Sequence, residues 1–86
     1  MRRRAVLVTG ANGEVGHGLI DRLAQMGETN IVALDVMELH DSLRPKVKAA
    51  VIGDILDQDM LQRIMSRYEI GSIYHLAALL STRAEI

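Results

Sequence analysis

Short apolar stretches of strand length alternate with amphipathic stretches along this chain. Strands are predicted at 4–9, 30–35, 49–52 and 72–76. Between them, apolar residues recur at helical spacing over 13–26 and again after residue 57. The second helix is expected to bury one face, formed by Leu61, Ile64, Met65 and Tyr68. Alternating strands and helices of this kind predict an α/β protein with a parallel sheet.

Turn-forming and capping residues set the expected ends of these elements. Gly27 is placed to end the first helix in a left-handed conformation. Asp57 is a suitable N-cap for the second helix, and Gly71 is predicted to stop it. The stretch 36–48 has a weak pattern that Pro45 interrupts, so we expect a loop with at most one or two helical turns.

Right-handed crossovers place the first strand in the centre of the sheet and give the strand order 3-2-1-4. This is a Rossmann-type doubly wound arrangement, here with four strands, and its topological switch point lies between strands 1 and 4. Ligands bind at the carboxyl ends of the strands at such a point. The predicted crevice is therefore bordered by the turn after the first strand, by Asp35, by Asp54 and by the segment Ala77–Ala78.

Three glycines follow the first strand at positions 10, 13 and 16. Gly10 can adopt backbone angles that a side chain would forbid, and Gly13 allows a ligand to approach the main chain. Gly16 is expected to permit close packing of the helix on the strand. The free N–H groups and the positive dipole end of the helix then face the space above the turn. A pyrophosphate suits that space.

The glycine spacing alone is weak evidence for a bound ligand, because a strand, a turn and a helix can have this spacing without binding anything. Asp35 strengthens it, since this acid ends the second strand about 20 residues after Gly16, the spacing expected of a carboxylate that binds a ribose diol. The alternative is an ordinary solvated acid. Val36 and Met37 follow Asp35, and no arginine is there to receive a 2′-phosphate, so NAD is predicted over NADP.

Composition narrows the function further. The 86 residues suffice for one small domain, and the net charge of −1 gives no field that would attract nucleic acid or anionic lipid. The chain has no cysteine, and its three histidines lack metal-ligand spacing, so neither disulfides nor a metal site is expected. No apolar run approaches 18 residues, and no signal peptide is recognisable. A cytoplasmic protein without a membrane partner is predicted.

The motif TGANGEVG at 9–16, Asp35, GDI at 53–55 with Asp57, and HLAA at 75–78 span nearly the whole chain in order. With them, the sequence resembles the extended short-chain dehydrogenase/reductase family of NAD-dependent epimerases and dehydratases. The resemblance implies that Asp54 and the Ile55 backbone meet adenine, and that Ala77 and Ala78 run beside the nicotinamide ribose. The cofactor-binding residues expected on this basis are Gly10, Asn12, Gly13, Glu14, Val15, Gly16, Asp35, Asp54, Ile55, Leu76, Ala77 and Ala78.

Within that family, the stretch 74–85 is most similar to the epimerase-related L-threonine 3-dehydrogenases, which implies that Ser81 lies near a bound amino-acid substrate. Nucleotide-sugar 4-epimerases or dehydratases, and a non-catalytic NAD(P)-sensing module, are the alternatives. The family's catalytic Tyr-x-x-x-Lys pair is missing, because Ser72 and Ala78 stand four positions after Tyr68 and Tyr74. We therefore expect residues 1–86 to be the N-terminal part of a longer enzyme, with no catalytic residue of its own and association into a homodimer or larger species.

Overall fold

The computed structural model describes residues 4–76, which form a four-stranded parallel sheet in the order β3-β2-β1-β4. The strands are β1 (Ala5–Thr9), β2 (Ile31–Asp35), β3 (Ala49–Ile52) and β4 (Ile70–His75). The helices are α1 (Glu14–Gln25), the short 3-10 helix η1 (Arg44–Lys46) and α2 (Gln58–Arg67). The predicted α/β class, parallel pairing and strand order 3-2-1-4 are confirmed.

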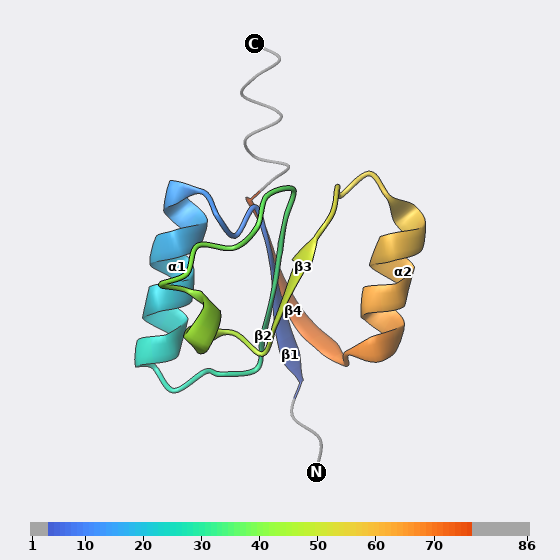
Figure 1. The fold of residues 1–86 in the computed structure, drawn as a ribbon. Helices are drawn as coiled ribbons and strands as arrows, with labels where there is room; N and C mark the ends of the chain where they lie inside the picture. The colour runs from blue at the N-terminus through green and yellow to red at the C-terminus, as the bar shows by residue number, and fades with distance from the viewer. Residues whose placement is uncertain (1–3, 77–86) are drawn as a thin grey trace.

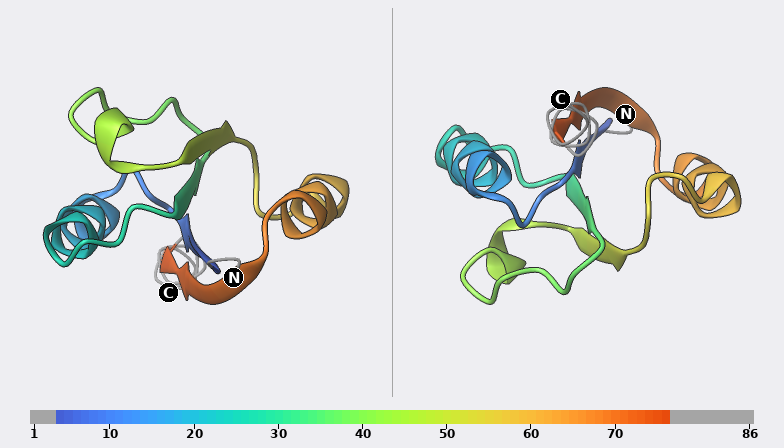
Figure 2. Two further views of the ribbon diagram at one scale, coloured as in Figure 1. Left: turned by 90° about the horizontal axis from the view of Figure 1, so that it is seen from below. Right: turned by 90° about the horizontal axis from the view of Figure 1, so that it is seen from above.

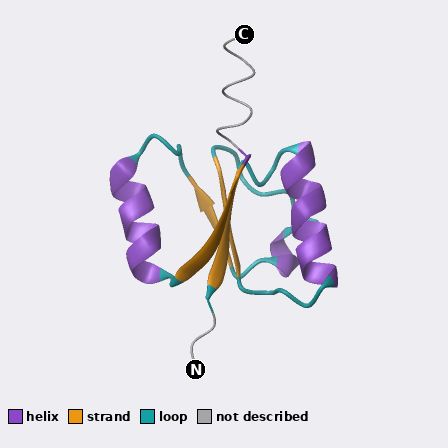
Figure 3. Cartoon of the chain, turned by 180° about the vertical axis from the view of Figure 1, so that it is seen from behind, coloured by secondary structure: helices purple, strands orange, loops and turns teal. Residues whose placement is uncertain are grey.

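The sheet is covered on both faces. Helix α1 and the loop that carries η1 lie on one face, and α2 lies on the other (Figures 1 and 2). The chain moves from β1 to β2 and β3 in one direction and then returns past β1 to β4. With crossovers of one hand, this reversal places the two long helices on opposite sides of the sheet (Figure 3).

Successive side chains of β1 point alternately into two hydrophobic cores, one on each face of the sheet. Val8 of β1 packs with Ile20 of α1 on one face, while Leu7 packs with Ile64 of α2 on the other. In β2 the four residues 31–34 are all buried. That burial explains why β2 reads as an unbroken apolar run and not as an alternating pattern.

The residues predicted to end α1 and to cap α2 do so in the structure. Gly27 follows Met26, the C-cap of α1, and has φ +87°, the left-handed conformation that ends a helix readily at glycine. The Asp57 carboxylate accepts a hydrogen bond from the Met60 N–H at 3.1 Å and so caps α2. The loop between β2 and β3 contains only the single turn η1, as predicted.

Two details of α2 differ from the prediction. The helix ends at Arg67, and Gly71 lies inside β4 instead of stopping the helix. The reason is tertiary: Ile70 already pairs with Ala5 of β1, so the backbone must be extended before residue 71. The buried stripe also runs through Met60 and Ile64, whereas Met65 is 49% exposed.

Strand β4 is an edge strand of the described sheet and is mostly exposed. Ile73 and Tyr74 keep 52% and 41% of their surface in contact with solvent. Ile73 is paired with Leu7, and its side chain borders an apolar groove of about 440 Å³ between β1, β4 and α2. This face of the sheet is therefore incompletely covered beside β4.

Candidate functional site

The turn between β1 and α1 is built by two glycines with different backbone conformations. Gly10 has φ +69°, a left-handed conformation that side chains disfavour. The Gly13 N–H donates to the Gly10 carbonyl at 3.1 Å, which closes the turn. Gly13 is extended and forms the N-cap of α1, and no side chain caps the helix. The first amides of α1 therefore remain for an anion or for solvent.

Gly16 permits the close packing predicted for it, and the contact falls on the residues that directly follow β1. A Cβ at this position would lie 2.5 Å from the Gly10 carbonyl oxygen and 2.6 Å from that of Ala11. Gly16 thus lets the first turn of α1 press against the glycine turn itself, which fixes the shape of the site's floor.

Asp35 is held against this turn by its own carboxylate. Its Oδ2 accepts a hydrogen bond from the Asn12 N–H at 2.9 Å, and its Oδ1 accepts one from the Met37 N–H at 3.0 Å. An ionised carboxylate offers about four acceptor positions. Two bonds therefore fix its orientation and leave capacity for two hydroxyl groups of a ligand. The structure brings Asp35 and the glycine turn together, as the sequence predicted.

Asn12 uses its side chain to fix the segment after β2. Its Oδ1 accepts from the His40 N–H at 2.9 Å, and its Nδ2 donates to the Glu38 carbonyl at 3.2 Å. The sequence predicts a cofactor contact for Asn12 and carries no signal for this link to Glu38 and His40. Glu14 and Val15, also assigned to the cofactor, are exposed in the first turn of α1.

Asp54 and Ile55 lie beyond the carboxyl end of β3. The Gly53 N–H donates to the Asp35 carbonyl at 2.9 Å, so the ends of β2 and β3 are side by side. Asp54 Oδ1 accepts from the Leu56 N–H at 2.9 Å and shapes the turn, while Ile55 packs into the core on the α2 face. Asp54 is thus placed on the same edge of the sheet as Asp35.

Exposed apolar side chains gather at this edge and were not assigned a role from the sequence. Val36, Met37 and Ile52 are 64%, 66% and 60% exposed. They follow or end β2 and β3, next to Asp35 and its partner strand. The signal in the sequence is that apolar residues continue after Asp35, the acid that ends the buried strand β2. An apolar surface beside a carboxylate suits a flat ring attached to a diol.

The ends of β1 and β4 are joined by side chains. Thr9 Oγ1 and His75 Nδ1 are 2.9 Å apart, and these residues are paired across the two strands. Leu76 is half-buried and packs on the core of the α1 face. The remaining predicted residues Ala77, Ala78 and Ser81 lie outside the described residues.

A group of charged side chains connects α1 to the loop that carries η1. Lys46 Nζ donates to Asp21 Oδ1, and this hydrogen bond lowers the pKa of the Asp21 carboxyl below its ordinary value of 3.8. His17 Nε2 lies 3.9 Å from Asp21 Oδ2, and the centroids of the His17 and His40 rings are 5.6 Å apart. Within residues 4–76, no group of three or more His, Cys, Asp or Glu residues is arranged to hold a metal ion.

Residues 6–85 match the model of the family described as "NAD dependent epimerase/dehydratase family". This match covers far more than half of the chain, including the glycine turn, Asp35 and Asp54. The chain belongs to the NAD-dependent epimerase/dehydratase family. In the part of this family member that the structure describes, no helix has the length and apolar character needed to cross a membrane.

Matches to known proteins support this family assignment. Uncharacterized epimerase/dehydratases of Staphylococcus aureus strains USA300 and N315 are 30% identical over 83 residues, which cover 95% of this chain and 26% of each relative. The solved structure of an L-threonine dehydrogenase from Clostridium difficile superposes with a TM-score of 0.66 at 25% identity. That match covers 87% of this chain and 24% of the dehydrogenase. The chain thus spans about a quarter of the length of these proteins.

Proposed function

We propose that this family member is the NAD-binding N-terminal segment of a longer NAD-dependent L-threonine 3-dehydrogenase. The observation that carries the cofactor assignment is the bond between the Asp35 carboxylate and the Asn12 N–H. It holds an acid that can bind a ribose diol directly beside a helix N-terminus that can bind a pyrophosphate. These are the two groups that adjoin each other in the adenosine half of a dinucleotide.

The same geometry supports NAD over NADP. Val36 and Met37 follow Asp35 and offer no positive charge to a 2′-phosphate. A phosphate at about 4 Å from the carboxylate would meet a repulsion of roughly 4 kcal/mol per charge pair at an effective dielectric constant near 20, and solvent reduces this value. Asp35 is therefore proposed to select against NADP.

The adenine ring is proposed to lie at the ends of β2 and β3. Asp54 would accept a hydrogen bond from its amino group, and the Ile55 backbone would meet its edge. Val36, Met37 and Ile52 supply exposed apolar surface at this edge, which an adenine could cover. Leu76, Ala77 and Ala78 are proposed to run along the nicotinamide side, after the Thr9–His75 contact that joins β1 to β4.

In this proposal the chain binds and orients the cofactor, and the rest of the enzyme performs the proton transfer. When bound, NAD accepts the hydride from the carbon that bears the substrate hydroxyl. The hydroxyl proton must go to a base at the same time or before. The sequence contains no Tyr-x-x-x-Lys pair to serve as that base. Ser81 is proposed to contact the amino-acid substrate.

The similarity to the L-threonine dehydrogenase supports the choice of substrate. A second candidate is a nucleotide-sugar 4-epimerase or dehydratase, which the descriptions of the Staphylococcus aureus relatives favour. In that case the cofactor would stay bound and be regenerated in each cycle, and no net NADH would form. The two candidates share the cofactor site and differ in the remainder of the enzyme.

The test is an assay of the complete parent enzyme with both substrate classes. We expect L-threonine to produce NADH, and UDP-glucose to remain unchanged. Conversion of the UDP-sugar without release of NADH would establish the second candidate instead. A Gly13→Val variant of the parent serves as the control, because it should lose both activities if they use this cofactor site. Absence of a Tyr-x-x-x-Lys pair from the parent sequence would contradict both enzyme assignments.

A further inference from the structure

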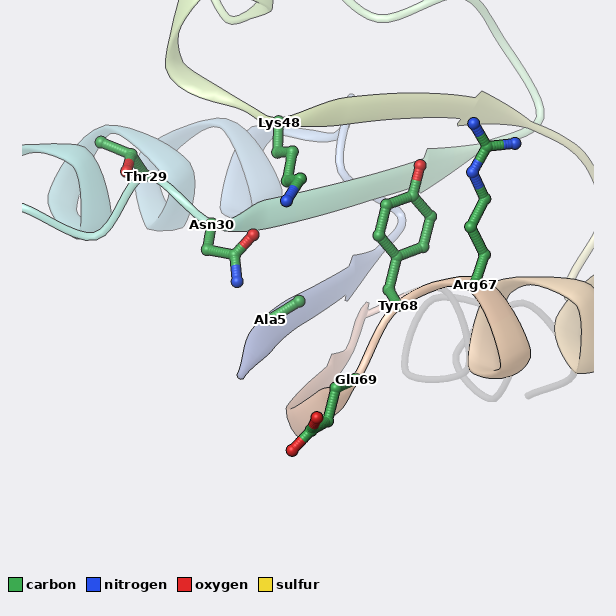
Figure 4. A pocket seen from close by; sticks show the side chains of 7 residues that line it. All are labelled: Ala5, Thr29, Asn30, Lys48, Arg67, Tyr68 and Glu69. Carbon is green, nitrogen blue, oxygen red and sulfur yellow. The ribbon is translucent and has the colours of Figure 1, made fainter. Parts of the chain in front are cut away.

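A second concave surface lies at the amino ends of the strands, at the opposite end of the sheet from the glycine turn. It is a pocket of about 530 Å³ whose walls come from the segments that enter all four strands (Figure 4). Its volume falls in the range of small-molecule sites, about 300–1,000 Å³. Neither the family motif nor the proposed function involves its residues.

The floor of this pocket is held by backbone hydrogen bonds. The Ala5 N–H donates to the Glu69 carbonyl at 2.7 Å, and the Val6 N–H donates to the Asn30 carbonyl at 2.9 Å. The Lys48 N–H donates to the Ile31 carbonyl at 2.8 Å. Because these amides are satisfied within the fold, a ligand would be recognised by the side chains around the pocket.

The charge of the pocket is positive. Lys48 and Arg67 both line it, and neither cation takes part in the ion pairs found among residues 4–76. Glu69 also borders the pocket, but Arg4 Nε lies 3.6 Å from its carboxylate. In Figure 4 the Glu69 side chain points away from Lys48, whose amine is directed into the space above Ala5. The negative charge of Glu69 is therefore turned away from the cations.

The Tyr68 ring stands between Lys48 and Arg67 on the side of the pocket, so a ligand that reaches both cations must lie along the ring. Its side chain is half-buried and packs on the core of the α2 face, while the Arg67 guanidinium carbon lies 5.9 Å from its ring centroid. In Figure 4 the ring stands opposite Lys48 and Asn30. The pocket thus combines two positive charges with hydroxyl and amide groups and one flat apolar surface.

We propose that this pocket binds a small dianion, an organic phosphate or a dicarboxylate, through Lys48 and Arg67. The Tyr68 ring contacts the carbon skeleton of the ligand. Two negative charges match the two cations, and the volume exceeds that of an inorganic ion alone. The site is separate from the glycine turn and does not depend on the proposed function.

The test is a titration of the ¹⁵N-labelled 86-residue chain carrying Tyr74→Lys, a substitution outside the pocket that is expected to limit association through β4. The titration is done once with inorganic phosphate and once with succinate, and amide chemical shifts are followed. We expect saturable shifts at Asn30, Lys48 and Tyr68. Lys48→Gln and Arg67→Gln should each weaken binding about two- to fivefold, the size expected of exposed charge pairs. Arg63→Gln, at an exposed position of α2 that does not line the pocket, should leave binding unchanged.

A response to phosphate alone, or to succinate alone, supports the site and identifies the ligand group, and a response to both supports the dianion class. Shifts that do not saturate, or that Arg63→Gln reduces as much as Lys48→Gln, would overturn the proposal. Circular dichroism of Lys48→Gln and Arg67→Gln checks that these variants keep the fold. Gly13→Val should leave this binding intact, so failure of the cofactor assignment is distinguished from failure of this one.

Discussion

The Asp35 carboxylate accepts a hydrogen bond from the backbone N–H of Asn12 at 2.9 Å, which joins the end of β2 to the glycine turn after β1. The two residues are 23 positions apart in the sequence. This contact places the Asp35 carboxylate against the turn, so that a ligand bound at the N-terminus of α1 would lie close to its negative charge.

Asp35→Ala in the parent enzyme should weaken NAD binding by at least about tenfold, the effect of losing hydrogen bonds to a charged acceptor. It should also narrow the gap between NAD and NADP, because the repulsion of the 2′-phosphate disappears. Isothermal titration with both cofactors measures this. Asp41→Ala is the matched control, since the Asp41 side chain is 99% exposed in the loop. Equal affinity of the unmodified enzyme for NAD and NADP would contradict the assigned role.

Gly13→Val should abolish NAD binding while the fold survives. Gly13 has φ −76° and ψ 171°, extended angles that any residue can adopt, so the substitution creates no backbone strain. The added branches would occupy the space where the pyrophosphate meets the main chain. Titration with NAD, together with circular dichroism, checks the expectation. Retained binding would mean that the turn has only a structural role.

Gly16→Ala and Gly18→Ala should change stability in opposite directions. A Cβ at Gly16 would meet the Gly10 carbonyl oxygen at 2.5 Å, so we expect a loss of about 1–3 kcal/mol in the free energy of unfolding. A Cβ at Gly18 meets nothing within 4 Å, and replacing a glycine inside a helix should stabilise by about 0.5–1 kcal/mol. Urea unfolding of both variants measures the contrast. Equal effects would show that Gly16 is not closely packed.

The Asp21–Lys46 contact should make a small part of the stability dependent on pH. The hydrogen bond from Lys46 lowers the pKa of Asp21 below its ordinary value of 3.8 in the folded state. The contribution is therefore fully present above the ordinary value and is lost as the pH falls through the lowered pKa. An NMR titration of the Asp21 carboxyl carbon follows this directly. Lys46→Gln should return the Asp21 pKa toward 3.8, and an unchanged pKa in that variant would rule out Lys46 as the main cause.

The isolated 86-residue chain should associate and should show no turnover of L-threonine. Ile73 and Tyr74 are exposed on β4, an edge of the described sheet, and exposed edges recruit further strands. Tyr74→Lys should shift the chain toward monomers in sedimentation velocity. A monodisperse monomer in the unmodified chain would refute the edge argument. Measurable NADH formation would show that catalytic residues lie within these 86 positions.

The sequence by itself determined the order of the elements and the position of the glycine turn. Strand β1, the turn and α1 are adjacent in the chain, so local patterns specify them: apolar strand residues, a glycine with φ +69°, and a helix ended by Gly27. The strand order followed from alternation and crossover handedness, which are general properties of the chain. Asp35 was recognised by its spacing from the turn, because both ends of that spacing are fixed by regular elements.

The tertiary structure decided the features that depend on contacts between distant segments. Gly71 became part of β4 because β1 offered a partner for Ile70, and pairing outweighed the local preference of glycine to end a helix. Gly16 was found against the carbonyls of the turn, and Asn12 was found to hold the loop at Glu38 and His40. The basic pocket arises only when the starts of all four strands meet at one end of the sheet. No local pattern encodes such meetings, because they depend on where folding brings residues that lie tens of positions apart.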